Sequence, residues 1–183
     1  MKSMYLQYET NRLRLEILGV NHCREVLRFY EKNRRLFEAY EGIKPSNFYT
    51  TGYQSEILRI EYQMALKGQS VRFFAILKET GQIIGTTSLQ NIQPAPYKNA
   101  ILGYRFDEDF HHQGYAHEAV SQILRIGFED LDLKRIVAYV QRINQPSLRL
   151  LSRLGFTYEG TARSFANIQG VWTDHEQFSL IKA

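Results

Sequence analysis

YRFDEDFHHQGYAHE, residues 104–118, is the stretch that decides the fold. In it a strand ends, a short loop follows, and a turn of small residues opens a helix. A helix start presents unpaired N–H groups and the positive end of the helix dipole, which together favour a bound phosphate. Gly114 lets the backbone come close to a ligand, and Ala116 keeps the next turn thin. A turn that caps a helix for packing alone would use the same residues, so both interpretations stay open.

The segments on both sides predict alternating strands and helices. Leu13, Leu15 and Ile17 alternate with charged residues, which is the period of a half-buried strand. Asn21 is the expected N-cap of the first helix. Before the Gly114 turn we expect a strand over 10–18, a helix over 21–33, a turn-rich aromatic segment over 36–52, a helix over 54–67, and strands over 71–78, 83–90 and 99–106. After it we expect a helix to about 130, a strand over 134–140, a short helix up to Gly155, and strands over 156–163 and 172–181.

A second informative segment is NQPSLRLLSRLGF, residues 144–156. Asn144 directly follows a predicted strand, and Ser147 lies one helical turn further on. In a structural interpretation, Asn144 and Ser147 cap the helix, and Gly155 ends it. In a functional interpretation, the same two polar side chains face a ligand held at the preceding turn.

Composition limits the class of protein. The chain has 183 residues and a net charge of +4, and we expect one α/β domain over 1–183. Basic residues are scattered, so nucleic-acid binding is not expected. The single cysteine, Cys23, permits no internal disulfide, which fits a location in the cytoplasm. We expect its side chain to fill the core of the protein. The charged start from Met1 to Leu15 does not resemble a signal peptide, and no stretch approaches the roughly 20 apolar residues of a membrane span.

Taken together, the two segments resemble the GNAT acetyltransferase superfamily. The chain is similar in particular to the branch of ribosomal-protein N-terminal alanine and serine acetyltransferases. The matching motifs are TNRLRLEIL at 10–18, GTTSL at 85–89, LGYRF at 102–106, QGYAHEA at 113–119, the N-x-x-S-x-x-L-L-x-x-L-G-F segment, and YEG at 158–160. The resemblance implies an α/β (α+β) fold with a mixed, mostly antiparallel twisted sheet of about six or seven strands and about four helices. It also implies acetyl-CoA in the splay between the two central strands.

The resemblance assigns roles to particular residues. The backbone of Tyr104, Arg105 and Phe106 would pair with the pantetheine arm of acetyl-CoA. Asn144 would hydrogen-bond the pantetheine, and Ser147 would lie near the thioester sulfur. The pyrophosphate would be held by backbone amides of the turn: His112, Gln113, Gly114, Tyr115, Ala116 and His117. The reaction would then be acetyl transfer to an amine, which requires no covalent intermediate.

Three positions depart from the pattern of the superfamily. Many members carry a tyrosine as general acid seven residues after the asparagine, where this chain has Leu151. The branch resemblance offers Ser147 instead, as a hydrogen-bond donor to the sulfur. The two positions where a glutamate base is expected are Tyr139 and Ala166. We therefore expect Asp174 to assist catalysis, with a structural hydrogen bond as its alternative role.

Other groups could also move the proton. Glu38 and Glu41 lie in the 36–52 segment, which resembles the acceptor-binding lid, and His175 follows Asp174. His111 and His112 could relay a proton or simply make polar contacts. No metal is expected, because two adjacent histidines are poorly spaced for one ion.

Three functions stay open at this point. The first is acetylation of a protein α-amine, for instance on a ribosomal protein, and the second is acetylation of a small amine such as a polyamine or aminoglycoside. The third is a non-catalytic acyl-CoA-binding module. A homodimer is possible and is not determined by the sequence.

Overall fold

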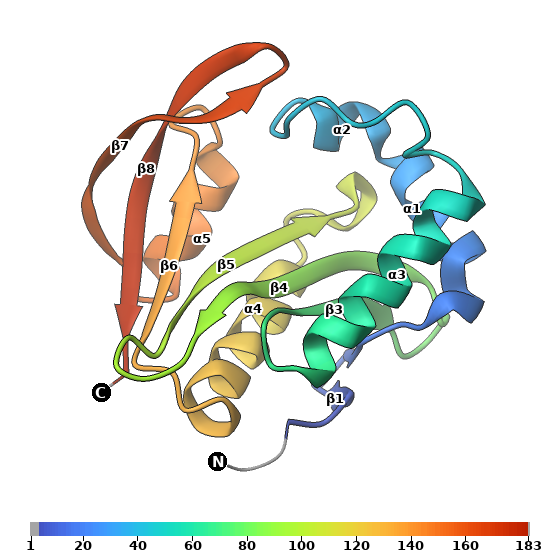
Figure 1. Cartoon of the computed structure of the whole chain (residues 1–183), viewed down its shortest axis with the longest axis horizontal. Helices are drawn as coiled ribbons and strands as arrows, with labels where there is room; N and C mark the ends of the chain where they lie inside the picture. Colours follow the sequence, from blue (N-terminus) through green and yellow to red (C-terminus); the bar gives the residue numbers. More distant parts are fainter. Residues whose placement is uncertain (1–3, 183) are drawn as a thin grey trace.

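A computed structural model describes residues 4–182, in which eight strands form one open twisted sheet (Figure 1). The order across the sheet is β1-β2-β3-β4-β5-β6-β8-β7, and neighbours are antiparallel except for the parallel pair β5 and β6. The strands are β1 Gln7–Glu9, β2 Leu13–Glu16, β3 Val71–Leu77, β4 Ile83–Gln93, β5 Asn99–Phe106, β6 Arg135–Val140, β7 Thr157–Ile168 and β8 Val171–Ile181. This confirms the expected mixed, mostly antiparallel twisted sheet, but it has eight strands and not six or seven, because Gln7–Glu9 pairs with β2 as an edge strand.

Five α-helices accompany the sheet in residues 4–182. They are α1 Cys23–Lys32, α2 Arg34–Glu38, α3 Thr51–Leu66, α4 Tyr115–Arg125 and α5 Gln145–Arg153. A π-helical turn, Ile126–Asp130, prolongs α4, so this helical stretch ends at the predicted residue. α4 packs against β2, β4 and β5, whereas α1 contacts α3 and β4.

Successive side chains of β3 point to opposite faces of the sheet, and both faces are apolar, which explains why helices cover both of them. Phe73, Ala75 and Leu77 point into a core that includes the buried face of α4. Phe74 and Ile76 point into a second core with α1 and α3. Because successive side chains of a strand face opposite ways, one apolar strand buries side chains in both cores.

The two halves of the sheet separate between β5 and β6. These strands pair at three positions only, which are Asn99 with Arg135, Ala100 with Ile136, and Ile101 with Val137. Beyond them, residues 102–106 of β5 and 138–140 of β6 have no pairing with each other, although each strand keeps its outer neighbour. The predicted splay is therefore present, and it leaves two free backbone edges facing each other.

Some sequence expectations were wrong at element boundaries. The segment 36–52 was expected to be irregular, but α2 occupies its beginning, and the strand β1 was not expected at all. Asn21 is not the cap of α1, because a 3₁₀ turn over Val20–His22 precedes that helix. α3 begins at Thr51 and not near Gln54, because the Thr50 side chain accepts a hydrogen bond from Tyr53 N.

The last hairpin is longer than expected. β7 continues to Ile168, so the stretch 164–172, expected to be a loop, is mostly paired strand. Gln169 and Gly170 form the turn, with φ of +49° and +89°. Positive φ at both central residues fits the tight turns that match the twist of a hairpin. The hairpin therefore reaches toward α2, as Figure 1 shows.

Candidate active site

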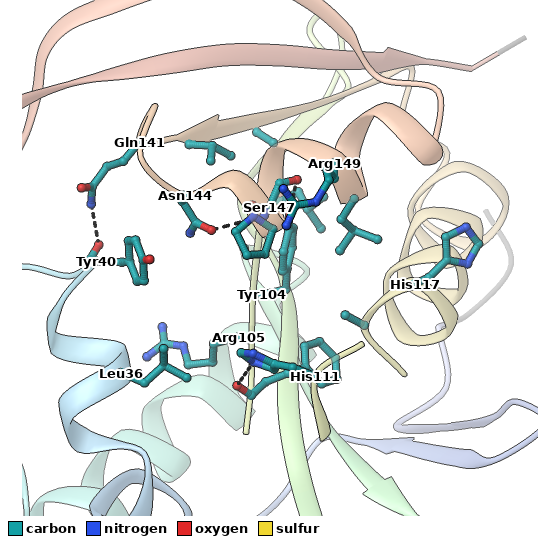
Figure 2. A pocket seen from close by; sticks show the side chains of 18 of the residues that line it. Leu36, Tyr40, Tyr104, Arg105, His111, His117, Gln141, Asn144, Ser147 and Arg149 are labelled. Carbon is teal, nitrogen blue, oxygen red and sulfur yellow. Dashed lines mark hydrogen bonds between the residues drawn. The ribbon is translucent and has the colours of Figure 1, made fainter. Parts of the chain in front are cut away.

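A cleft of about 490 Å³ opens where β5 and β6 diverge (Figure 2). Its lining comes from the end of β5, the turn before α4, the end of β6, the start of α5, and residues between 36 and 41. The predicted site residues that line it are Tyr104, Arg105, Phe106, His112, Gly114, Tyr115, Ala116, His117, Asn144 and Ser147. Gln113 and Asp174 are not among the lining residues.

The turn before α4 has the backbone shape of an anion site. His112 and Gly114 have φ of +60° and +82°, in the left-handed region. α4 then begins at Tyr115, and its first internal hydrogen bond runs from Glu118 N to Gly114 O at 3.0 Å. The amides of Tyr115, Ala116 and His117 therefore have no partner within the helix, as expected for a first turn that can hold a phosphate.

Arg12 holds this turn in place, a role that the sequence analysis did not identify. Its Nη1 donates to Gln113 O at 2.9 Å, its Nε donates to Glu118 at 2.8 Å, and its guanidinium lies 4.1 Å from the centre of the Tyr115 ring. Burial alone would raise the pKa of Glu118, but hydrogen bonds from Thr10 and Arg12 lower it below its usual value. The charged carboxylate thus fixes the helix start against β2.

At the start of α5, Asn144 acts as a helix cap. Its Oδ1 accepts a hydrogen bond from Ser147 N at 3.2 Å, and Pro146 lies in the first turn. The structural interpretation of Asn144 is therefore confirmed. Capping uses only the side-chain oxygen, so the amide NH₂ remains able to donate into the cleft.

The Ser147 hydroxyl lies 2.5 Å from the hydroxyl of Tyr104 (Figure 2). Burial raises the pKa of Tyr104 to about 12, although the hydrogen bond with Ser147 opposes that shift. The phenol is therefore protonated at neutral pH and can donate a hydrogen bond to the serine oxygen. The sequence analysis used Tyr104 only for its backbone, because no spacing rule brings β5 and α5 together.

At the α2 end of the cleft, side-chain amides connect the β6–β8–β7 half of the sheet to the end of α2 and the residues after it. Gln141, directly after β6, donates to Tyr40 O at 3.1 Å. Gln169, in the hairpin turn, donates to Glu38 O at 3.1 Å and to Glu41 O at 3.0 Å. These bonds join the end of β6 and the hairpin turn to the segment around Glu38–Glu41.

The candidate carboxylate bases are already engaged. Glu41 lines the cleft and forms ion pairs with Arg105 at 2.7 Å and with Lys44. Glu38 accepts hydrogen bonds from Arg34 at 3.1 Å and from a tyrosine hydroxyl at 3.0 Å. Asp174 is exposed and accepts from Ser164 N at 2.8 Å, which matches its structural alternative.

Tyr139 of β6 and His175 of β8 line the cleft, and Phe165 of β7 packs against both rings. Tyr139 stacks on Phe165, with ring centres 4.1 Å apart and planes 19° apart. Phe165 also lies 5.0 Å from the ring of His175, which lines the cleft. Ala166 pairs with Thr173 across the hairpin. Phe165 thus lies between Tyr139 and the buried His175, and Ala166 pairs with a residue two positions from His175.

Two further observations concern the part of the chain that the structure describes. Within residues 4–182, no three or more His, Cys, Asp or Glu side chains are grouped closely enough to hold a metal ion. None of the helices in this range combines the length and the apolar character needed to cross a membrane.

Comparison with known proteins identifies the class. A family model described as acetyltransferase (GNAT) domain matches residues 12–157. The probable N-acetyltransferase YjcK of Bacillus subtilis is 33% identical over 165 residues, which cover 90% of this chain and 91% of that protein. The chain therefore belongs to the GNAT acetyltransferase family, and it is an N-acetyltransferase.

Solved structures agree with this assignment. The ribosomal-protein-S5-alanine acetyltransferase from Vibrio fischeri superimposes with a TM-score of 0.92 at 25% identity, over 97% of both chains. Mycobacterium smegmatis RimJ, solved with CoA-disulfide, has the same fold with a TM-score of 0.87 at 22% identity, over 92% of this chain and 81% of that one.

Proposed function

We propose that this enzyme transfers the acetyl group of acetyl-CoA to the N-terminal α-amine of a protein, such as a ribosomal protein. The observation that carries the proposal is the cleft itself, which leads from the turn at 112–117 past the Tyr104–Ser147 hydroxyls to a mouth beside α2. The similarity to the S5-alanine acetyltransferase of Vibrio fischeri supports a protein N-terminus as the acceptor.

The lining of the cleft suits acetyl-CoA. The free backbone edge of Tyr104, Arg105 and Phe106 can pair with the amides of pantetheine, and the Asn144 NH₂ can donate to it. The pyrophosphate would lie at the amides of 112–117. Arg149 and Arg153 also line the cleft, and their positive charge would favour the phosphates.

The hydroxyl pair would assist departure of the thiolate. Ser147 would donate its proton in a hydrogen bond toward the sulfur, while Tyr104 donates to the serine oxygen. A serine hydroxyl alone is a weak acid, and a donor behind it increases its hydrogen-bonding strength. Asp174 lies outside the cleft lining, so its assistance would have to act at a distance, through water.

A small amine is the second candidate acceptor. The hydrogen bonds of Gln169 to the backbone of Glu38 and Glu41 hold the hairpin against the segment after α2, and such an enclosed arrangement would suit a compact substrate. Glu41 is the only carboxylate among the lining residues that the structure describes, and Arg105 pairs with it. A polycation would therefore find little free negative charge in the cleft.

A free-thiol assay with acetyl-CoA tests the proposal. We expect release of CoA with peptides that begin with Ala or Ser, and none with the same peptides when their N-terminus is blocked. Polyamines and aminoglycosides complete the panel, and turnover with these alone would replace the protein acceptor by a small amine. A cytoplasmic location and a homodimer remain predictions of this proposal.

A further inference from the structure

His175 occupies a buried position in the wall of the cleft that β6 and the β7–β8 hairpin form. It lies in β8, is 7% exposed, and lines the cleft. Tyr139 of β6 pairs with Gln177 of β8, so these two side chains share one face of the sheet. His175 is two residues from Gln177 and therefore faces the same way.

The charged neighbours of His175 in β8 do not compete for the same space. Asp174 and Glu176 face the opposite way by the alternation of the strand. Asp174 is bonded to Ser164 N, and Glu176 is ion-paired with Arg142 at 2.5 Å. The imidazole is thus the titratable group that β8 directs into the cleft.

The hydrogen bond of the ring determines its tautomer. Nδ1 of His175 lies 3.3 Å from the backbone oxygen of Thr173. A carbonyl oxygen can only accept, so Nδ1 must carry the proton. In the neutral ring, Nε2 then holds a lone pair. Among residues 4–182 no group hydrogen-bonds to Nε2, which leaves it able to accept a proton.

Packing fixes the orientation of the ring. Phe165 contacts it at a centroid distance of 5.0 Å and is itself stacked on Tyr139. Ala166, one of the two positions without the expected glutamate, pairs with Thr173, whose carbonyl orients the imidazole. His175 is therefore linked to both of these positions, to Tyr139 through the ring of Phe165 and to Ala166 through Thr173.

We propose that His175 is the general base of the acetyl transfer. In this step Nε2 accepts a proton from the acceptor amine as its nitrogen bonds to the thioester carbonyl carbon. The C–S bond then breaks, the thiolate leaves with a hydrogen bond from the Ser147 hydroxyl and takes its proton from water, and His175 returns its proton to solvent. This step is the same for a protein N-terminus and for a small amine. The proposal therefore rests on one part of the proposed function, which is that the enzyme acetylates an amine.

Other titratable groups face the same region and must be separated from His175 in the test. They are Tyr139 from β6, Tyr40 and Glu41 from the segment after α2, and Arg105 from β5. β7 contributes Ala162 opposite His175, and the ring of Phe165. Glu41 is paired with Arg105 and Lys44, so its carboxylate is already engaged, whereas Nε2 of His175 is not.

Kinetics of His175→Asn test the proposal with any amine that the wild type acetylates. Asparagine keeps an N–H near the Thr173 oxygen but removes Nε2. We expect kcat/KM to fall by roughly 10²–10⁴-fold, with acetyl-CoA affinity by calorimetry unchanged. The limb of the wild-type pH profile on which activity rises as the imidazole loses its proton should disappear, and added imidazole should restore part of the rate. The matched control is His22→Asn, which removes a histidine outside the cleft lining.

Nitrogen NMR of histidine-labelled protein tests the same proposal without an acceptor. We expect the neutral His175 to carry its proton on Nδ1, assigned by comparison with His175→Asn. A proton on Nε2 instead would overturn the proposal, as would full activity of His175→Asn or a loss of rate that imidazole does not reverse. If no peptide of the panel were acetylated, the protein acceptor would be wrong but the role of His175 would not be affected. The kinetic test would then use a small amine as the acceptor.

Discussion

Tyr104 and Ser147 lie 43 residues apart in the chain, yet their hydroxyl oxygens are 2.5 Å from each other beside the proposed thioester site. Because burial raises the pKa of Tyr104 to about 12, the phenol stays protonated throughout the range in which the enzyme would work. The pair can therefore stabilise a departing thiolate without being a strong acid. Its contribution should be largest in the transition state, where negative charge develops on the sulfur.

Ser147→Ala should lower kcat more than it raises the KM for acetyl-CoA. We expect a loss of roughly 1–3 kcal/mol in transition-state stabilisation, which is about 5–150-fold in rate. Tyr104→Phe should cost less, because Ser147 keeps its own hydroxyl. Ser152→Ala, an exposed serine of the same helix, is the control. An unchanged kcat in Ser147→Ala, with α5 intact, would mean that Ser147 takes part only in the start of the helix and not in catalysis.

Single replacements of the nearby carboxylates should leave turnover. Glu38, Glu41 and Asp174 each already bind a cation or a backbone amide, so we expect none of them to be indispensable as a base. A protein α-amine has a pKa near 8 and is partly neutral without help. We expect Glu38→Gln, Glu41→Gln and Asp174→Asn each to retain a measurable kcat/KM that rises across pH 6–9, a range chosen for the assay. Loss of both turnover and pH dependence in one variant would identify a dedicated carboxylate base.

At the scale of elements, the start of α4 should determine cofactor affinity. Gly114 has a φ of +82°, which proline cannot adopt, and proline also lacks the amide that a phosphate would accept from. Gly114→Pro should therefore abolish measurable acetyl-CoA binding in calorimetry. Gly114→Ala keeps the amide and adds strain of about 1–2 kcal/mol, so its loss should be smaller. Unchanged affinity in a folded Gly114→Pro protein would place the phosphates elsewhere.

Glu159 of β7 joins β6 and β8, the two strands that place Tyr139 and His175 in the cleft. Its carboxylate accepts from Arg135 of β6 and from Ser179 and Gln177 of β8, and these bonds lower its pKa from 4.5 to about 2. A lowered pKa means that the folded state favours the charged carboxylate. The stabilisation is therefore complete above about pH 4.5 and is lost as the pH falls toward 2.

Glu159→Gln should accordingly reduce the free energy of unfolding by about 1 kcal/mol at neutral pH, as for a partly exposed ion pair. The difference from wild type should shrink when urea unfolding is repeated at successively lower pH values below about 4.5. Glu79→Gln, in an exposed turn, is the control and should show little difference at any pH. A difference that stays constant across the acid range would mean that the charge of Glu159 is not what stabilises the hairpin.

At the scale of the whole molecule, local signals in the sequence predicted most of the strands and helices, and the resemblance to the GNAT superfamily predicted how they form one sheet. The alternation of β2, the apolar run of β3, the helical spacing in α4, and the small-residue turn at Gly114 all depend on neighbours within one element. The boundaries failed where tertiary contacts decide them. β1 is three residues long and exists because it pairs with β2, and the tip of β7 pairs although its sequence resembles a loop.

The cleft was predicted only in part. The residues of the turn and of α5 were found because their motifs are contiguous. The Tyr104–Ser147 contact, the Arg12 contact to Gln113 and the bridge from Gln169 were not found, since each joins positions at least 43 residues apart. Such contacts depend on the sheet order, in which β5 and β6 are neighbours, and no spacing in one sequence encodes that order.

That sheet order leads to a last prediction about how the halves of the molecule respond to acetyl-CoA. Only three residue pairs join β5 to β6, and the edges at 102–106 and 138–140 face the cleft unpaired with each other. If acetyl-CoA pairs with these edges, their amides should exchange hydrogen more slowly when it is bound. At a concentration of 100 times Kd, exchange that requires release of the ligand should slow by up to about 100-fold.

Hydrogen exchange followed by mass spectrometry can resolve this effect by segment. We expect protection at 102–106, at 138–140 and at the turn 112–117, and no change in the buried strand β3, which already pairs on both edges. The Gly114→Pro protein should show none of this protection, because it would not bind. Protection confined to the β7–β8 hairpin, with the two facing edges unchanged, would contradict the prediction, because the cofactor would then lie outside the gap that separates the two halves of the sheet.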